Sequence, residues 1–153
     1  MGSESEWMGK PLPPLRWKTN KCFVCGPENP AGLHVVFAAE GETGCRASYT
    51  ARAEHTGWPG IMHGGVAFLL MDEALAWALY FQGLYGVTAK VETRFRQPVS
   101  VGEKLVIQAW TLDRRRRLVD ARAEIRIDGD DGPLVAEATA TMYLQEIEEN
   151  EKT

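Results

Sequence analysis

Cysteine is scarce in this sequence: there are three in 153 residues, an odd number and too few for a disulfide scaffold. Positively charged residues are also fewer than negatively charged ones. The 17 Lys and Arg are outnumbered by 21 Asp and Glu, and the net charge of -4 argues against a general nucleic-acid binder. The first residues contain no apolar segment of the secretory type. We therefore expect a cytoplasmic protein without a nucleic-acid partner.

The sequence also lacks an uncharged hydrophobic run long enough to span a bilayer. Its most apolar stretch lies within Gly57–Tyr85, which begins with a glycine- and proline-rich loop ending in His-Gly-Gly at 63–65. About five helical turns follow that are apolar on nearly every face and interrupted only by Asp72 and Glu73. This run is short and has two acids at its centre, so we expect no membrane partner and a helix buried inside a domain.

Four segments with period-two alternation and two mostly apolar segments, 33–39 and 104–113, predict six β-strands around this helix, two before it and four after it. The expected ranges are 33–39, 44–51, 87–99, 104–113, 118–128 and 134–145. In the third strand, Ala89, Val91, Thr93 and Phe95 share one face. Turn signals at 113–117 and 128–133 give short connections, which indicate antiparallel neighbours. The sequence predicts an α+β fold, a curved antiparallel sheet wrapped around a long central helix.

The ends of the chain differ from this pattern. Residues 1–21 contain three prolines and are expected to form an extended arm, with Trp7, Leu15 and Trp17 available for packing. Residues 146–153 form an acidic tail, which we expect to be solvated. The single domain therefore spans 22–145.

Several segments share motifs with a known family. They are CFVCGPENPAGL at 22–33, HTGWPGIMHGGV at 55–66, LMDE at 70–73, TRFRQP at 93–98 and Gly-Glu at 102–103. Together they resemble the hotdog-fold thioesterases, especially the PaaI-like acyl-CoA thioesterases. The most specific feature is His-Gly-Gly followed by an acid nine residues after the histidine, combined with the later Phe-x-x-Pro.

The resemblance implies an enzyme that hydrolyses an acyl-CoA thioester to a carboxylic acid and free CoA without a cofactor. It also implies a homodimer or homotetramer with active sites at the dimer interface. The family pattern places the oxyanion donor at Gly64, where the helix N-terminus favours developing negative charge. Gly65 would permit the tight turn. The alternative is that Gly64 and Gly65 only form the turn into the helix.

By the family pattern, Asp72 is the nucleophile or general base. Burying an ionised carboxylate alone is costly, so an acid here should face a cleft, water or a cation. The alternative is a structural carboxylate paired with an arginine from a neighbouring strand. Glu73 projects about 100° away around the helix and is the second candidate for the acid, or a partner for an arginine across the interface.

Three further positions are candidates for catalytic support. His63 is expected to orient the loop or bind the thioester region, or to be an ordinary loop residue. The family often has a polar amide where this chain has Gly57, so Thr88, His55 or a partner-subunit residue would have to replace it. Thr88 occupies the place where related enzymes carry a small hydroxyl residue opposite the acid, and its alternative role is simply to open a strand.

Substrate contacts are expected from arginines and aromatic residues. Arg94, Arg96 and the run 114–117 are candidates for the CoA phosphates, although a charge run at a hairpin is more often solvated. Trp58, Trp77 and Phe81 are candidates for the acyl pocket, although aromatic residues at helical spacing are more often core.

The Cys22-x-x-Cys25 motif suggests a zinc site. A closed zinc site needs four ligands, and a second such pair is absent. His34, Cys45 or His55 would have to complete it, and we therefore expect no metal.

Two other functions remain open on this scaffold. The first is a non-catalytic acyl-CoA-binding or regulatory module, because fold does not fix function. The second is an acyl-chain hydratase or dehydratase. Related hydratases carry a different turn, Met-Pro-Gly-Val, before their acid, so this is the weaker alternative.

Overall fold

The computed structural model describes residues 6–7, 10–11 and 21–145. Most of the expected arm and the whole acidic tail lie outside these residues. Within the arm, β1 (Glu6–Trp7) and β2 (Lys10–Pro11) pair antiparallel. No helix in the described part is long and apolar enough to cross a bilayer.

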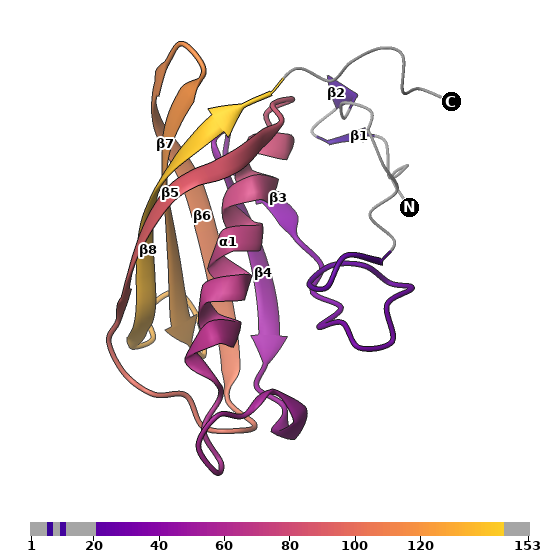
Figure 1. The fold of residues 1–153 in the computed structure, drawn as a ribbon, viewed down its shortest axis with the longest axis vertical. Helices are drawn as coiled ribbons and strands as arrows, with labels where there is room; N and C mark the ends of the chain where they lie inside the picture. Colours follow the sequence, from indigo (N-terminus) through magenta and orange to yellow (C-terminus); the bar gives the residue numbers. More distant parts are fainter. Residues whose placement is uncertain (1–5, 8–9, 12–20, 146–153) are drawn as a thin grey trace.

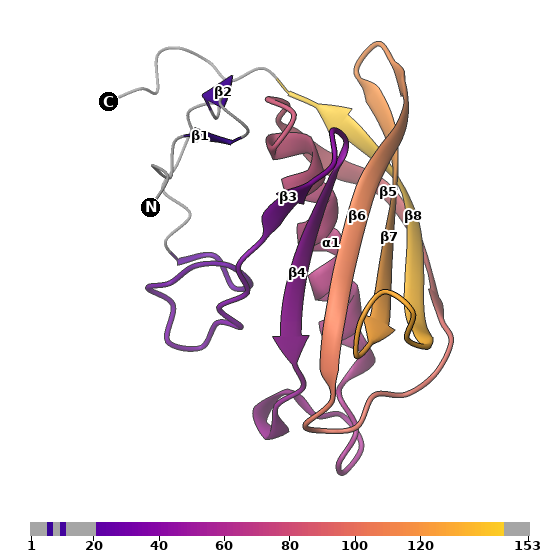
Figure 2. The ribbon, with the colours of Figure 1, turned by 180° about the vertical axis from the view of Figure 1, so that it is seen from behind.

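One antiparallel sheet curves around a single long helix, α1 (Gly64–Tyr80) (Figures 1 and 2). Its strands are β3 (Ala38–Glu40), β4 (Gly44–Thr50), β5 (Gly86–Phe95), β6 (Lys104–Arg115), β7 (Leu118–Ile127) and β8 (Leu134–Leu144). Their spatial order is β3-β4-β6-β7-β8-β5, and every neighbouring pair is antiparallel. A 3-10 helix (Ala53–His55) lies between β4 and α1. The α+β class and the hotdog fold implied by the resemblance are confirmed.

Helix α1 forms the centre of the core. Seven of its residues are buried: Ala67, Leu70, Met71, Ala74, Leu75, Ala78 and Leu79. Each buried leucine contributes about 1.5–3 kcal/mol through the area removed from water. The alanines among them have small side chains, which lets the backbone of α1 approach the sheet closely. The thiol of Cys45 on β4 donates to the carbonyl of Ala74 at 3.1 Å. The helix therefore needs the surrounding sheet to remove its apolar faces from water.

The backbone conformation of the hairpin between β7 and β8 explains why its sequence is rich in glycine. Asp128 and Gly129 have positive φ values of 61° and 133°. A Cβ built on Gly132 would lie 1.6 Å from the carbonyl oxygen of Ile127, so no other residue fits there without a backbone shift. This confirms the turn predicted at 128–133.

The expected strand at 33–39 is wrong for most of its length. Only Ala38–Glu40 pairs with β4. Leu33 and Val35 instead donate their N–H groups to carbonyls of the preceding loop, those of Phe23 and Val24. His34 between them has a φ of 54°, which interrupts an extended strand. The apolar run therefore belongs to a loop that packs on the core.

The third predicted strand also differs from expectation. A register shift between Thr88 and Lys90 disturbs the alternation and leaves Ala89 exposed. β5 ends at Phe95, which is also exposed. β5 pairs with β8 and not with β6, because the segment 96–103 crosses the end of the sheet (Figure 1). Buried Val99 fixes this crossing, since its carbonyl accepts from Met62 N–H at 2.8 Å. As a result, β5 is an edge strand.

Candidate active site

The N-terminus of α1 presents a backbone amide that is available to a ligand. His63 is the N-cap, and its Nδ1 accepts the N–H of Gly65 at 2.8 Å. The carbonyl of His63 accepts the N–H of Val66 at 2.9 Å. No group in the described part of the chain accepts a hydrogen bond from Gly64 N–H. His63 therefore accepts hydrogen bonds from the N–H groups of Gly65 and Val66. The N–H of Gly64 remains available to an oxygen atom of a ligand.

The space around Gly64 is open. A Cβ built on Gly64 would approach Phe95 Cε1 to 3.6 Å, an ordinary van der Waals contact. Phe95 itself is 58% exposed, and Trp58 in the preceding loop is 79% exposed. Large apolar side chains in such positions are typical of surfaces that a ligand or partner covers.

Asp72 lies half-buried in the middle of α1. It accepts a hydrogen bond from Thr88 Oγ1 at 2.8 Å, which joins the helix to the start of β5. Among the described residues, no Lys, Arg or His forms an ion pair with Asp72. The structure therefore gives this carboxylate a hydroxyl partner, and not the arginine of the structural alternative.

Glu73 faces a different element. Its Oε1 accepts from the thiol of Cys22 at 3.3 Å and from the indole N–H of Trp77 at 3.2 Å. Glu73 therefore contacts the loop before β3 and the next turn of α1, whereas Asp72 contacts β5. The two adjacent acids are separated as the helical geometry predicts.

The Cys22-x-x-Cys25 motif lies beside Glu73. The N–H of Cys25 points to Cys22 Sγ at 3.5 Å. Burial, followed by the neighbouring Glu73 carboxylate, raises the pKa of the Cys25 thiol well above its ordinary value.

The three residues suggested from the sequence to complete a zinc site lie elsewhere. His34 Nε2 contacts the carbonyl of Asn29 at 2.6 Å. Cys45 bonds to the helix backbone, and the ring of His55 contacts the hydroxyl of Tyr49. None of the three belongs to the Cys22, Cys25 and Glu73 cluster.

His55 supports the loop that leads to α1. Its carbonyl accepts the N–H of His63 at 2.9 Å, and its Nδ1 pairs with the Tyr49 hydroxyl. Burial lowers the pKa of His55 below its ordinary value of 6.5. A Cβ on Gly57 would lie 3.2 Å from His63 Cδ2, so the imidazole occupies the space that an amide side chain at position 57 would enter.

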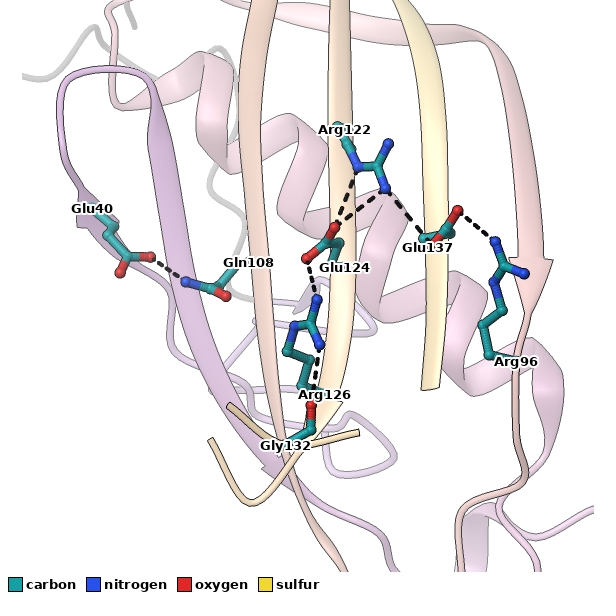
Figure 3. Close-up of polar contacts among 8 residues, drawn as sticks. All are labelled: Glu40, Arg96, Gln108, Arg122, Glu124, Arg126, Gly132 and Glu137. Carbon is teal, nitrogen blue, oxygen red and sulfur yellow. Dashed lines mark hydrogen bonds and ion pairs between the residues drawn. The ribbon is translucent and has the colours of Figure 1, made fainter. Parts of the chain in front are cut away.

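The candidate arginines are spread over the molecule. Arg94 is exposed on β5. Arg96 pairs with Glu137 at 3.1 Å on the sheet face that points away from α1 (Figure 3). That pair belongs to a charge network whose other members are Arg122, Glu124 and Arg126. Arg114 and Arg117 line a hollow with residues 83–85, at the C-terminal end of α1. Within one subunit the 114–117 run is therefore remote from Gly64.

Two of the three candidate acyl-pocket residues lie in an aromatic cluster with Phe37 and Tyr80. Trp77 stacks on Phe37 with ring centroids 6.1 Å apart and contacts Phe81 at 5.3 Å. Phe81 is buried and Trp77 half-buried, so both pack near the C-terminal end of α1. Trp58 lies apart from them, in the loop before α1.

Comparison with known proteins identifies the family. Residues 59–134 match the thioesterase superfamily. The chain belongs to this superfamily. It is 29% identical to acyl-coenzyme A thioesterase 13 of Homo sapiens over 114 residues, which cover 73% of this chain and 79% of the human protein.

Solved structures agree with this assignment. A thioesterase superfamily protein aligns with a TM-score of 0.72 and 30% identity, over 77% of this chain and 60% of that chain. The PaaI protein of E. coli, from its phenylacetic acid degradation operon, has the same fold. It aligns with a TM-score of 0.69 and 23% identity, over 74% of this chain and 81% of the PaaI chain.

The contacts among Cys22, Cys25 and Glu73 were not predicted from the sequence. Glu73 was considered only as an alternative acid or a partner for an arginine, and the cysteine motif only with histidine or cysteine partners. The Cys22–Glu73 hydrogen bond joins residues 51 positions apart. No local sequence signal indicates that pairing, because it depends on how the loop folds onto the helix.

Proposed function

We propose that this protein is an acyl-CoA thioesterase that hydrolyses its substrate to a carboxylic acid and free CoA. The observation that carries the proposal is that α1 has both an unbonded N-terminal amide, Gly64 N–H, and a carboxylate supported by a hydroxyl group, Asp72. The printed name of the human relative, an acyl-coenzyme A thioesterase, supports the substrate class.

The two groups match the needs of thioester hydrolysis. Gly64 N–H donates to the thioester oxygen as negative charge develops there. Asp72 either attacks the carbonyl carbon or removes a proton from the water that attacks it. The carbon–sulfur bond then breaks, and the CoA sulfur leaves and takes up a proton. If Asp72 attacks directly, water hydrolyses the resulting anhydride and restores the carboxylate.

Helix geometry supports a site shared between two subunits. Gly64 and Asp72 are eight residues apart on α1. At 1.5 Å per residue they are separated by about 12 Å along the axis, too far to act on one carbonyl group. Gly64 of one subunit would therefore act with Asp72 of its partner.

The edge strand β5 offers a way to bring them together. Asp72 is bonded to Thr88 near the start of β5, and Gly64 lies against Phe95 at its end. Two β5 edges paired antiparallel about an axis between Val91 and Glu92 would place Thr88 opposite Phe95 of the partner subunit. Asp72 would then approach Gly64 of the partner subunit. Such pairing would also cover the exposed edge.

The first test is release of free CoA thiol from short, medium, long and phenylacetyl-type acyl-CoA substrates. Turnover that disappears in Asp72→Asn supports the proposal and gives the acyl preference. Absence of both binding and turnover across the panel contradicts it.

A second test addresses the shared site. Gly64→Pro removes the amide hydrogen, and Asp72→Asn removes the carboxylate. Heterodimers of the two variants, isolated with different affinity tags, should recover about half of wild-type activity, because one site receives both lesions and the other none. A site confined to one subunit would leave both halves of the heterodimer defective, with no recovery.

The alternative is a non-catalytic acyl-CoA-binding module. It is favoured by Gly57, where the His63 ring fills the space of the usual amide. Tight CoA-ester binding by the wild type without thiol release would establish this alternative.

A further inference from the structure

Three metal-binding side chains converge beside the middle of α1, away from Asp72. Cys22, Cys25 and Glu73 each offer one ligand atom, and these atoms lie within 4.8 Å of one another. All three side chains are half-buried. The cysteines come from the loop before β3, and the glutamate comes from the helix. The fold therefore assembles a group of donors that is not contiguous in sequence.

Hydrogen bonds and one buried residue hold the shape of the loop that supplies the cysteines. Its Gly26 N–H donates to the Cys22 carbonyl at 2.9 Å, and Cys25 N–H points to Cys22 Sγ. Val24, between the cysteines, is only 1% exposed and anchors the loop in the core. The two sulfurs are thus presented on an ordered turn.

The distances suit a small cation. Zinc binds sulfur at about 2.3 Å and carboxylate oxygen at about 2.0 Å, so tetrahedral geometry separates the two ligand atoms by roughly 3.5 Å. Cys22 Sγ lies 3.3 Å from Glu73 Oε1, so a cation needs little rearrangement. The indole N–H of Trp77 donates to the same carboxylate oxygen and orients it from outside the cluster.

The charges also favour a cation. The Cys22 thiol donates a hydrogen bond to Glu73 Oε1, so the sulfur and the carboxylate oxygen already face one another. Two thiolates and a carboxylate carry three negative charges, which a divalent cation would largely neutralise while releasing the thiol protons.

We propose that Cys22, Cys25 and Glu73 bind one divalent cation of the zinc class, with a water molecule as the fourth ligand. The two sulfurs select a borderline-soft metal over magnesium or calcium. The cation fastens the loop 21–37 to α1 and engages Glu73, whereas Asp72 on another side of the helix remains free for thioester chemistry. The proposal differs from the expectation from sequence of no metal, because Glu73 supplies one of the two ligands that the motif lacked and water supplies the other.

The test uses the full chain under reducing conditions, stripped with a chelator and titrated with zinc. We expect about one zinc per chain by elemental analysis and a higher melting temperature in the zinc-bound form. Cobalt(II) should give thiolate-to-metal charge-transfer absorption and the strong visible bands of a tetrahedral site. Failure of the wild type to bind zinc, or a cobalt complex without thiolate absorption, overturns the proposal.

Variants locate the site. Cys22→Ser, Cys25→Ser and Glu73→Gln should each weaken zinc binding at least about a hundredfold, since even supporting residues contribute 10- to 100-fold. Cys45→Ser is the matched control, because Cys45 lies outside the cluster and should leave zinc affinity unchanged. Unchanged affinity in Glu73→Gln overturns the assignment. Metal content is measured without acyl-CoA, so this result is independent of the proposed thioesterase activity.

Discussion

The hydroxyl of Thr88 donates a 2.8 Å hydrogen bond to Oδ1 of Asp72 and so connects β5 to the middle of α1. The second oxygen, Oδ2, accepts no hydrogen bond within the described part of the chain. One carboxylate oxygen is therefore fixed, and the other is available to water or substrate. This is the arrangement that a general base or nucleophile requires.

The first prediction concerns the choice between the two acids. Asp72→Asn should lower kcat by about a hundredfold or more, because it removes the acid–base group. Fold and CoA-ester binding should persist, since the amide oxygen can still accept from Thr88. Glu73→Gln should retain most of the turnover and is the matched control. Steady-state thiol release, with circular dichroism for folding, makes the comparison. Loss of turnover only in Glu73→Gln would reverse the assignment.

The second prediction isolates the Thr88 hydroxyl. Thr88→Val preserves the side-chain shape but removes the donor, and Thr88→Ser retains the donor. A hydrogen bond to a charged group contributes about 1.5 kcal/mol, so the valine variant should lose about tenfold in kcat. The serine variant should recover most of this loss, with KM little changed in both. Equal activity of the two variants would assign Thr88 a packing role only.

The third prediction concerns the amide of Gly64. Proline is tolerated at the first helical position, and His63 already has the extended conformation that proline requires before it, with φ -60° and ψ 134°. Gly64→Pro should therefore fold but lose about 100- to 1000-fold in kcat, the cost of removing one oxyanion donor. Gly64→Ala keeps the N–H and is the control, since its Cβ meets only Phe95 at ordinary distance. Thiol release and thermal melting are measured for both variants. An active, folded proline variant would exclude Gly64 as the donor.

Much of the fold could be predicted because two sequence patterns were clear, the alternation of the strands and the apolarity of the helix. The buried sides of β4, β7 and β8 follow the period-two pattern, and the helix was marked by its all-round apolarity. Strand order could not be predicted in the same way. The segment 96–103 is short enough for a hairpin, and only its tertiary anchor at Val99 shows that it crosses the sheet. Likewise, the positive φ of His34 interrupts a short apolar run that indicates a strand.

The candidate site also has parts that could be predicted from the sequence and parts that depend on tertiary packing. His63, Gly64 and Asp72 could be proposed because the family motif that they resemble is local to one loop and one helix. The contact between Thr88 and Asp72 was anticipated only through the family resemblance. The contact between Cys22 and Glu73 depends entirely on loop packing and was not anticipated.

The last prediction concerns pH. Burial lowers the pKa of His55 below its ordinary value of 6.5, so the folded state prefers the neutral ring that pairs with the Tyr49 hydroxyl. The unfolded chain therefore binds more protons as pH falls, and His55 should reduce stability progressively from about pH 6.5 down through its folded pKa. Melting temperatures between about pH 7.5 and 5.5 should fall less steeply in His55→Gln than in the wild type. The half-buried Glu137 and the exposed Asp130, whose pKa values are lowered by Arg96 and Arg46, stay ionised throughout this range. An identical slope in both proteins would show that His55 is not the group responsible.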